Sequence, residues 1–180
     1  MKIVFLNLLD GELAEPLRTF LQKHKPDTDV FCLQECYTEV QPILSELFEG
    51  YSRIGILKPE LHNENVFANV MLARNDWDIR DSGSNALTAD TGLLQYATLR
   101  RDTQVVHIGN VHGLPKPGKL DTPRRTQQSR EALELFSSLT GPHIIGGDFN
   151  VLPETQSVRM FEAAGYRDLI KDFDIKTTRN

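Results

Sequence analysis

The chain has 180 residues, of which 39% are hydrophobic and 25% charged, and this composition predicts one globular domain over residues 1–180 rather than a disordered chain. The formal net charge of -5 argues against broad electrostatic binding of nucleic acid, so a polyanion would have to meet a local basic patch or a metal ion. No apolar run reaches the ~20 residues of a membrane span, and the amino terminus does not resemble a signal peptide, so we expect a cytoplasmic protein.

The first part of the chain alternates between buried strands and amphipathic helices. In chain order we expect a strand over residues 2–9, a helix over 13–24, a strand over 29–35 and a helix over 39–48. Pro26 follows the first helix and prevents its continuation. This order of elements favours an α/β domain.

The middle of the chain lacks helical periodicity. Short strand-like segments follow one another with turn-like breaks, over residues 51–57, 66–73, 79–82, 93–101 and 104–111. We expect them to pair in a mainly antiparallel way, because no crossover helix separates them.

The last third returns to helices. A helix is expected over residues 121–139, with Thr122 as its cap and Pro123 in its first turn. Another is expected over residues 155–164, ended by Gly165. Residues 166–180 show no clear periodicity.

Between these two helices lies the stretch from His143 to Asn150. Ile144 and Ile145 suit a buried strand, and Asp148 and Asn150 follow at its carboxyl end. If the extended geometry continues, Asp148 and Asn150 point to the same side. The carboxyl ends of strands are where open α/β sheets bind ligands. The alternative is an ordinary polar turn that leaves the strand.

Other predicted strands also end in polar side chains. Asn7 and Glu35 follow two apolar strands, and Asn110 and His112 share one face of a third. Mg²⁺ prefers one or two carboxylates with waters and phosphate oxygens, and Glu35 is the best candidate for that carboxylate. Asp148 is a candidate to hold a water or a metal ion. Taken singly, a Glu at a strand end is more often a solvated or helix-capping group, and a His after a buried strand is as often structural as functional.

A few further residues have two interpretations. Cys32 and Cys36 are most simply a core residue and a loop residue. For Trp77 and Phe67, core packing is favoured over stacking on a base or lipid head group. Four basic residues form either an ordinary charged surface or a binding surface for an anionic substrate, namely Lys116, Lys119, Arg124 and Arg125.

The polar strand ends occur in an order that resembles the endonuclease/exonuclease/phosphatase superfamily. The resemblance covers essentially the whole chain and rests on four segments: Phe5-Leu6-Asn7, Leu33-Gln34-Glu35, Asn110-Val111-His112-Gly113 and Gly147-Asp148-Phe149-Asn150. That group includes DNase I-like nucleases, apurinic endonucleases, neutral sphingomyelinases and inositol polyphosphate phosphatases. Asp121-Thr122-Pro123, Arg125, Gln128 and Thr177-Thr178-Arg179 resemble its small bacterial members.

The resemblance implies a fold and an activity. The fold is a four-layer α/β sandwich, with two mixed or antiparallel sheets face to face and helices outside. The activity is Mg²⁺- or Mn²⁺-dependent attack of water on a phosphate ester, and we expect a phosphodiester in nucleic acid or a small molecule.

The resemblance also implies roles for the site residues. Glu35 resembles the metal ligand, and Asn7 resembles a group that orders the metal and the phosphate. Asp148 resembles the residue that aligns or activates the attacking water. Asn150 resembles a phosphate-binding group, and His112 one that stabilises charge on the phosphorus oxygens. We also place Asn110 at the substrate phosphate.

The sequence departs from the family pattern at its end. Family members continue with two further strands and a Ser-Asp-His element, and no Asp-His dipeptide occurs here. We therefore expect the C-terminal strands to be missing, which leaves an open sheet edge available to a partner. The chain is then either part of a longer enzyme, which we favour, or a protein that has lost full activity. The alternative function is a non-catalytic module that binds phosphorylated ligands or a protein.

Overall fold

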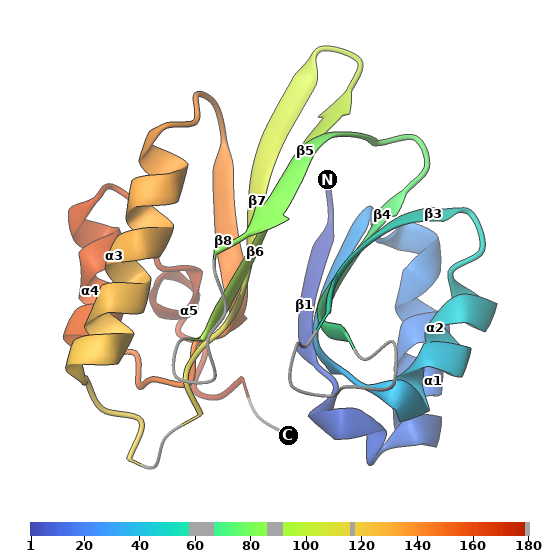
Figure 1. The fold of residues 1–180 in the computed structure, drawn as a ribbon, viewed down its shortest axis with the longest axis horizontal. Helices are drawn as coiled ribbons and strands as arrows, with labels where there is room; N and C mark the ends of the chain where they lie inside the picture. Colours follow the sequence, from blue (N-terminus) through green and yellow to red (C-terminus); the bar gives the residue numbers. More distant parts are fainter. Residues whose placement is uncertain (58–66, 86–91, 116–117, 179–180) are drawn as a thin grey trace.

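Two four-stranded sheets lie face to face, with helices on both outer sides, in the computed structural model of the protein (Figure 1). The structure describes residues 1–57, 67–85, 92–115 and 118–178. Helices α1 (Ala14–His24) and α2 (Gln41–Leu47) lie outside the first sheet. Helices α3 (Pro123–Ser137), α4 (Gln156–Ala163) and α5 (Leu169–Asp172) lie outside the second. This arrangement confirms the expected four layers.

The first sheet has the strand order β1-β2-β4-β3. Its strands are β1 (Ile3–Asn7), β2 (Val30–Cys36), β3 (Tyr51–Leu57) and β4 (Phe67–Arg74). The pair β1 and β2 is parallel and is joined through α1, as the β-α-β order predicts. The other two pairs are antiparallel.

The second sheet has the strand order β5-β6-β7-β8. Its strands are β5 (Asp78–Ser84), β6 (Leu93–Arg101), β7 (Gln104–His112) and β8 (His143–Asp148). Strands β5, β6 and β7 pair antiparallel, which confirms the prediction for the middle of the chain. Strand β8 returns through α3 and pairs parallel with β7.

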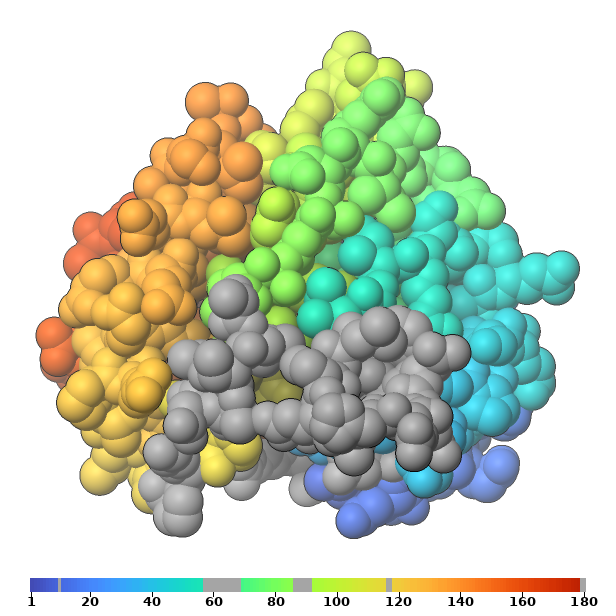
Figure 2. Space-filling view, viewed as in Figure 1, coloured from blue at the N-terminus to red at the C-terminus, as the bar shows by residue number. Residues whose placement is uncertain are grey.

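Three hydrophobic clusters hold the four layers together. One joins α1 and α2 to the outer face of the first sheet and includes Leu21, Phe31 and Leu44. A second lies between the sheets, and a third joins α3 and α4 to the second sheet around Phe136. In the space-filling view the blue-to-cyan part of the chain and the orange-to-red part form opposite sides of one molecule (Figure 2). None of the helices in the described residues is long and apolar enough to cross a bilayer.

Both β1 and β8 are edge strands. Within the part of the chain that the structure describes, each pairs with a strand on one side only, and all their residues are partly exposed. The partner expected at an open edge stays a prediction.

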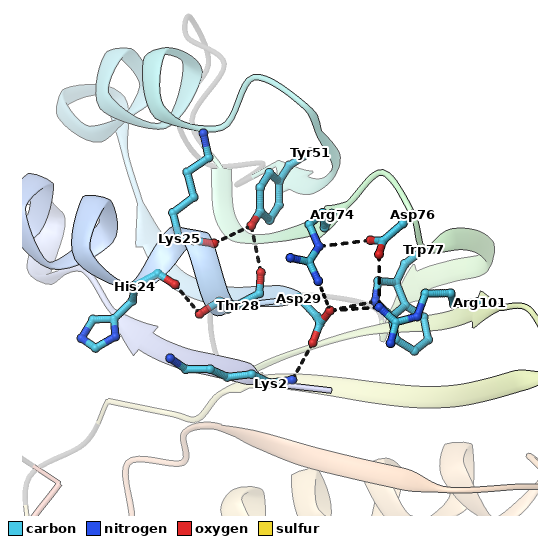
Figure 3. A network of polar contacts seen from close by, with 10 residues as sticks. All are labelled: Lys2, His24, Lys25, Thr28, Asp29, Tyr51, Arg74, Asp76, Trp77 and Arg101. Carbon is cyan, nitrogen blue, oxygen red and sulfur yellow. Dashed lines mark hydrogen bonds and ion pairs between the residues drawn. The ribbon is translucent and has the colours of Figure 1, made fainter.

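A network of polar contacts joins the sheets at the end where β2 begins (Figure 3). The carboxylate of Asp29 accepts from the Lys2 amide at 2.7 Å, Arg74 Nη2 at 2.5 Å, Trp77 Nε1 at 3.2 Å and Arg101 Nη1 at 3.3 Å. Arg74 belongs to the first sheet and Arg101 to the second. The Arg101 guanidinium also lies 4.3 Å from the Trp77 ring centre.

The exposure of the side chains tests the predictions made for Trp77, Cys32 and Cys36. Trp77 is 2% exposed, so core packing is its role and stacking on a ligand is excluded. The side chain of Phe67 lies outside the described residues. Cys36 is not in a loop, because it ends β2 and is fully buried like Cys32. Burial raises the pKa of both thiols, which makes neither a thiolate nucleophile.

Candidate active site

The carboxyl ends of the two parallel strand pairs meet at one mouth of the sandwich. Asn7 ends β1 and Glu35 lies near the end of β2, whereas His112 and Asp148 end β7 and β8. His112 and Asp148 are register partners, so their side chains leave neighbouring strands at the same level. The polar ends of four strands, two from each sheet, therefore meet at this mouth.

Asn7 links the two carboxylates of the mouth. Its Nδ2 donates to Glu35 Oε1 at 2.9 Å and lies 3.3 Å from Asp148 Oδ2. Its Oδ1 accepts from the Leu9 amide at 2.9 Å, which fixes the side-chain orientation. The side-chain amide of Asn7 therefore holds the Glu35 carboxylate of the first sheet beside the Asp148 carboxylate of the second.

Glu35 reaches this position through an unusual backbone conformation. Its φ is +56°, in the left-handed region that glutamate rarely adopts. Along β2, Cys32 packs between the sheets, whereas Leu33 and Cys36 both pack on the helix-covered side. Strict alternation would place residues 33 and 36 on opposite faces. The turn at Glu35 reverses the alternation and brings its carboxylate to the mouth.

His112 approaches Glu35 from the opposite sheet. Its Nε2 lies 3.3 Å from Glu35 Oε1, and the two side chains are 15% and 21% exposed. The approach is not aligned as a hydrogen bond, so among the residues that the structure describes His112 Nε2 is a buried polar atom without a hydrogen-bond partner. Such an atom stands out, because buried polar groups are normally paired.

Asp148 and Asn150 form a compact turn instead of a continued strand. Strand β8 stops at Asp148, and Asn150 has a φ of +54°, so the extended geometry on which their shared side depended does not continue. The backbone amide of Asn150 donates to Asp148 Oδ1 at 2.9 Å. The side-chain Nδ2 of Asn150 donates to the Gly113 carbonyl, also at 2.9 Å. Asp148 is thus held by Asn7 on one oxygen and by Asn150 on the other.

Two glycines allow the strands to approach this closely. A Cβ on Gly113 would lie 2.0 Å from the Phe149 carbonyl oxygen, and one on Gly147 would lie 2.1 Å from the Val111 oxygen. Gly147 also has a φ of +125°. A side chain at either position would push apart the ends of β7 and β8 and move His112 away from Asp148.

Asn110 lies one strand repeat deeper than His112 and is fully buried. Its Nδ2 donates to the Leu33 carbonyl at 3.1 Å and to Gln95 Oε1 at 3.0 Å, and its Oδ1 accepts from Gln34 Nε2 at 2.5 Å. Both amide hydrogens are used in this way, so Asn110 lies in the floor of the site. The sequence pattern places it on the correct face but does not show its depth.

The four basic residues considered from the sequence separate in space. Arg125 is 2% exposed and bonds to the carbonyls of Leu114 and Leu120, which makes it a structural residue. Arg124 is exposed, and Lys116 lies outside the described residues. Of the three that the structure describes, only Lys119 lies at the site, where its Nζ donates to Asn150 Oδ1 at 2.9 Å. Sequence reasoning did not separate it from the other three.

The mouth contains oxygen donors of the kind that hard divalent cations prefer. In the described ranges, no group of three or more His, Cys, Asp or Glu side chains is arranged to hold a metal ion. Two carboxylates do face each other across Asn7, and Mg²⁺ binds through one or two carboxylates with waters and substrate oxygens. The residues present therefore fit such an ion.

Comparison with known proteins identifies the family. The model of the Endonuclease/Exonuclease/phosphatase family matches residues 7–179, nearly the whole chain. The chain belongs to this family. No curated protein sequence matches it.

Solved structures of family members share the fold. An endonuclease/exonuclease/phosphatase family protein from Bacteroides thetaiotaomicron matches with a TM-score of 0.66 and 22% identity, covering 87% of this chain and 60% of that one. The human nocturnin catalytic domain with a bound sulfate anion matches with a TM-score of 0.65 and 22% identity, covering 89% and 68%. The mannosyl-6-phosphatase of B. thetaiotaomicron matches with a TM-score of 0.67 and 20% identity, covering 87% and 63%. The chain thus spans 60–68% of the length of each of these proteins.

Proposed function

We propose that the protein is a divalent-metal-dependent phosphoesterase that hydrolyses phosphodiesters. The observation that carries this proposal is the pair of carboxylates, Glu35 and Asp148, held side by side by one amide of Asn7. Membership of a family named for nucleases and phosphatases supports phosphate-ester hydrolysis. The sulfate bound to nocturnin and the name of the mannosyl-6-phosphatase support an anionic phosphate-like ligand.

Each side chain at the mouth has a role in this proposal. Glu35 would hold Mg²⁺ or Mn²⁺ with the help of Asn7. When bound, the ion would stabilise negative charge on the phosphate oxygens. Asp148 is fixed by Asn7 and by the backbone amide of Asn150, and it orients a water and accepts its proton as the oxygen attacks phosphorus. The bond from phosphorus to the ester oxygen breaks, and the departing oxygen takes a proton from solvent.

The remaining polar groups face the phosphate. Asn150 uses one hydrogen of Nδ2 on the Gly113 carbonyl, and the other is a donor for a phosphate oxygen. His112 supplies a second donor where charge increases in the transition state. Asn110 supports both from the floor, because its own hydrogens are occupied.

The proposal is tested by comparing the metal-dependent turnover of variants that lack a site carboxylate with that of the wild type. With bis-p-nitrophenyl phosphate as substrate, we expect Asp148→Ala and Glu35→Gln in the full-length protein to lower kcat about 10²- to 10⁴-fold. Glu134→Gln, which removes an exposed carboxylate of α3, should retain wild-type turnover. Circular dichroism would show whether the variants keep the fold.

Removal of the metal provides an independent control. EDTA should abolish turnover, and Mg²⁺ or Mn²⁺ should restore it. Saturable phosphate binding without product under either metal would instead support a non-catalytic binding module. Wild-type turnover in Asp148→Ala would refute the assignment of this site.

A further inference from the structure

The described parts of the segment between β7 and α3 are held by hydrogen bonds from α3 and from the chain just after the active-site turn. Arg125 bonds to the carbonyls of Leu114 and Leu120, near its two ends, with lengths of 3.1 Å and 2.6 Å. The Lys119 carbonyl accepts from the Leu152 amide at 2.9 Å, just beyond the Asp148–Asn150 turn. Lys119 itself has a φ of +47° and follows Gly118, whose φ is +80°. The backbone is therefore shaped to place Lys119 against that turn.

The ammonium group of Lys119 has an unusual partner. It donates to the neutral amide oxygen of Asn150 at 2.9 Å, and Lys119 is only partly exposed. By contrast, the ammonium groups of Lys2, Lys171 and Lys176 each pair with a carboxylate. Among the described residues no carboxylate pairs with Lys119. Within those residues its positive charge therefore has no ion-pair partner, and it lies beside Asn150, one of the proposed phosphate-binding groups.

A lysine ammonium has three hydrogens, of which the Asn150 bond uses one. The other two can donate to non-bridging oxygens of an anion bound at the mouth. A charge-assisted bond of this kind is roughly twice as strong as a bond between neutral groups. The overall charge of -5 makes a local cation more important for attracting an anionic substrate.

On the basis of the proposed phosphoesterase activity, we propose that Lys119 binds a non-bridging oxygen of the substrate phosphate and contributes to substrate affinity. Asn150 holds the ammonium group in place through its Oδ1 and donates to the same phosphate through its Nδ2. The contribution is to binding, equally in the ground state and the transition state, so removing the charge raises KM more than it lowers kcat.

Three substitutions separate charge from hydrogen bonding at Lys119. Lys119→Arg keeps the charge, Lys119→Gln keeps a donor for Asn150 without charge, and Lys119→Met removes both. Lys2→Met is a matched control, because it also removes one lysine charge. Lys2 lies just before β1, at the end of that strand away from Asn7, and pairs with Asp27. In the full-length protein, inorganic phosphate binding is measured by titration calorimetry and KM by steady-state kinetics.

We expect Lys119→Gln and Lys119→Met to weaken phosphate binding and raise KM about tenfold, with kcat changed less than about threefold. Lys119→Arg should remain within about threefold of wild type, and Lys2→Met should be unchanged. Wild-type phosphate affinity in Lys119→Gln, or no phosphate binding by the wild type, would overturn the proposal.

The phosphate titration does not depend on turnover. If the wild type binds phosphate but gives no product, the phosphoesterase assignment fails and the Lys119 variants still report on binding. If the wild type turns over and Lys119→Gln matches it in KM and phosphate affinity, only the role of Lys119 fails.

Discussion

Three non-glycine residues at the candidate site have left-handed backbone conformations: Glu35, Lys119 and Asn150, with φ values of +56°, +47° and +54°. Asparagine tolerates this region, but for glutamate it costs roughly 1–2 kcal/mol. Strain of this kind is often found at functional sites, where the surrounding structure enforces it. Here it carries a carboxylate from the helix-covered side of β2 to the mouth of the sandwich.

The strain at Glu35 can be measured by comparing two truncations. We expect Glu35→Gly to be more stable than Glu35→Ala by about 1 kcal/mol, because glycine adopts the left-handed region without a Cβ penalty. Both variants lose the carboxylate and with it turnover. Urea unfolding gives the two free energies of unfolding.

Cys32 provides the control within the same strand. Its φ is not positive, so the order should reverse, with Cys32→Ala more stable than Cys32→Gly by ~0.5–1 kcal/mol. Equal stabilities of the two Glu35 variants would show that the left-handed turn stores no strain.

At the scale of elements, four buried amides join the sheets directly beneath the site. Gln34 and Asn69 are register partners on β2 and β4, and Gln95 and Asn110 are partners on β6 and β7. Gln34 and Asn69 bond to Asn110, and Gln95 donates to the Ile54 carbonyl at 2.9 Å. A polar layer of this kind fixes how one sheet sits on the other, and so sets the distance between Glu35 and His112.

The amide layer predicts a defect that is both structural and catalytic. Asn110→Leu leaves Gln95 Oε1 and the Leu33 carbonyl without their donor, which we expect to cost about 2–4 kcal/mol of unfolding free energy. The turnover of the remaining folded protein should fall as well. Thermal unfolding and kcat measured on the same preparation test both parts.

Gln104→Leu on the same strand is the matched control. Gln104 is exposed at the start of β7, so its replacement should change stability by less than about 0.5 kcal/mol. If Asn110→Leu is as stable as this control, the amide layer does not join the sheets energetically.

Elements with a long apolar stripe were predictable, and short or locally distorted ones were not. The repeat of Leu17, Phe20 and Leu21 predicts α1, and Thr122 is the cap of α3, its Oγ1 accepting from the Arg125 amide at 3.2 Å. Helix α5 is only four residues long, too short for a helical period to show. The expected loop position of Cys36 is wrong because alternation assumes an unbroken strand, and the turn at Glu35 breaks it.

That the polar strand ends lie together at one mouth could be predicted from the sequence, whereas the depth of each side chain could not, and the roles of these residues stay predictions. Polar residues after apolar strands identify the mouth, because parallel strands end at the same edge. Whether a residue such as Asn110 faces substrate or the other sheet depends on how the sheets are stacked, and no local pattern encodes this. The distinction of Lys119 from Arg124 and Arg125 likewise depends on the path of the loop.

At the scale of the whole molecule, the cluster around Asp29 holds the sheets together at the end opposite the site (Figure 3). Burial alone would raise the pKa of Asp29. Hydrogen bonds from the Lys2 amide and Trp77, together with the charges of Arg74 and Arg101, hold that pKa below its ordinary value. A carboxyl group with a lowered folded-state pKa stabilises the fold above its unfolded-state pKa, and this stability is lost as pH falls through the folded-state value.

Asp29→Asn should therefore destabilise the protein at neutral pH and lose less stability than wild type on acidification. We expect a cost of about 2 kcal/mol at pH 7, less than the ~3–5 kcal/mol of a fully buried pair because both arginines are partly exposed. The difference from wild type should narrow as pH falls below about 4, the unfolded-state pKa of aspartate. Asp76→Asn is the control, because Asp76 contacts the same two arginines but is 48% exposed, and should cost less than ~1 kcal/mol. If the difference in unfolding free energy between Asp29→Asn and wild type is the same at pH 3 and pH 7, the carboxylate charge is not what holds the two sheets together at this end.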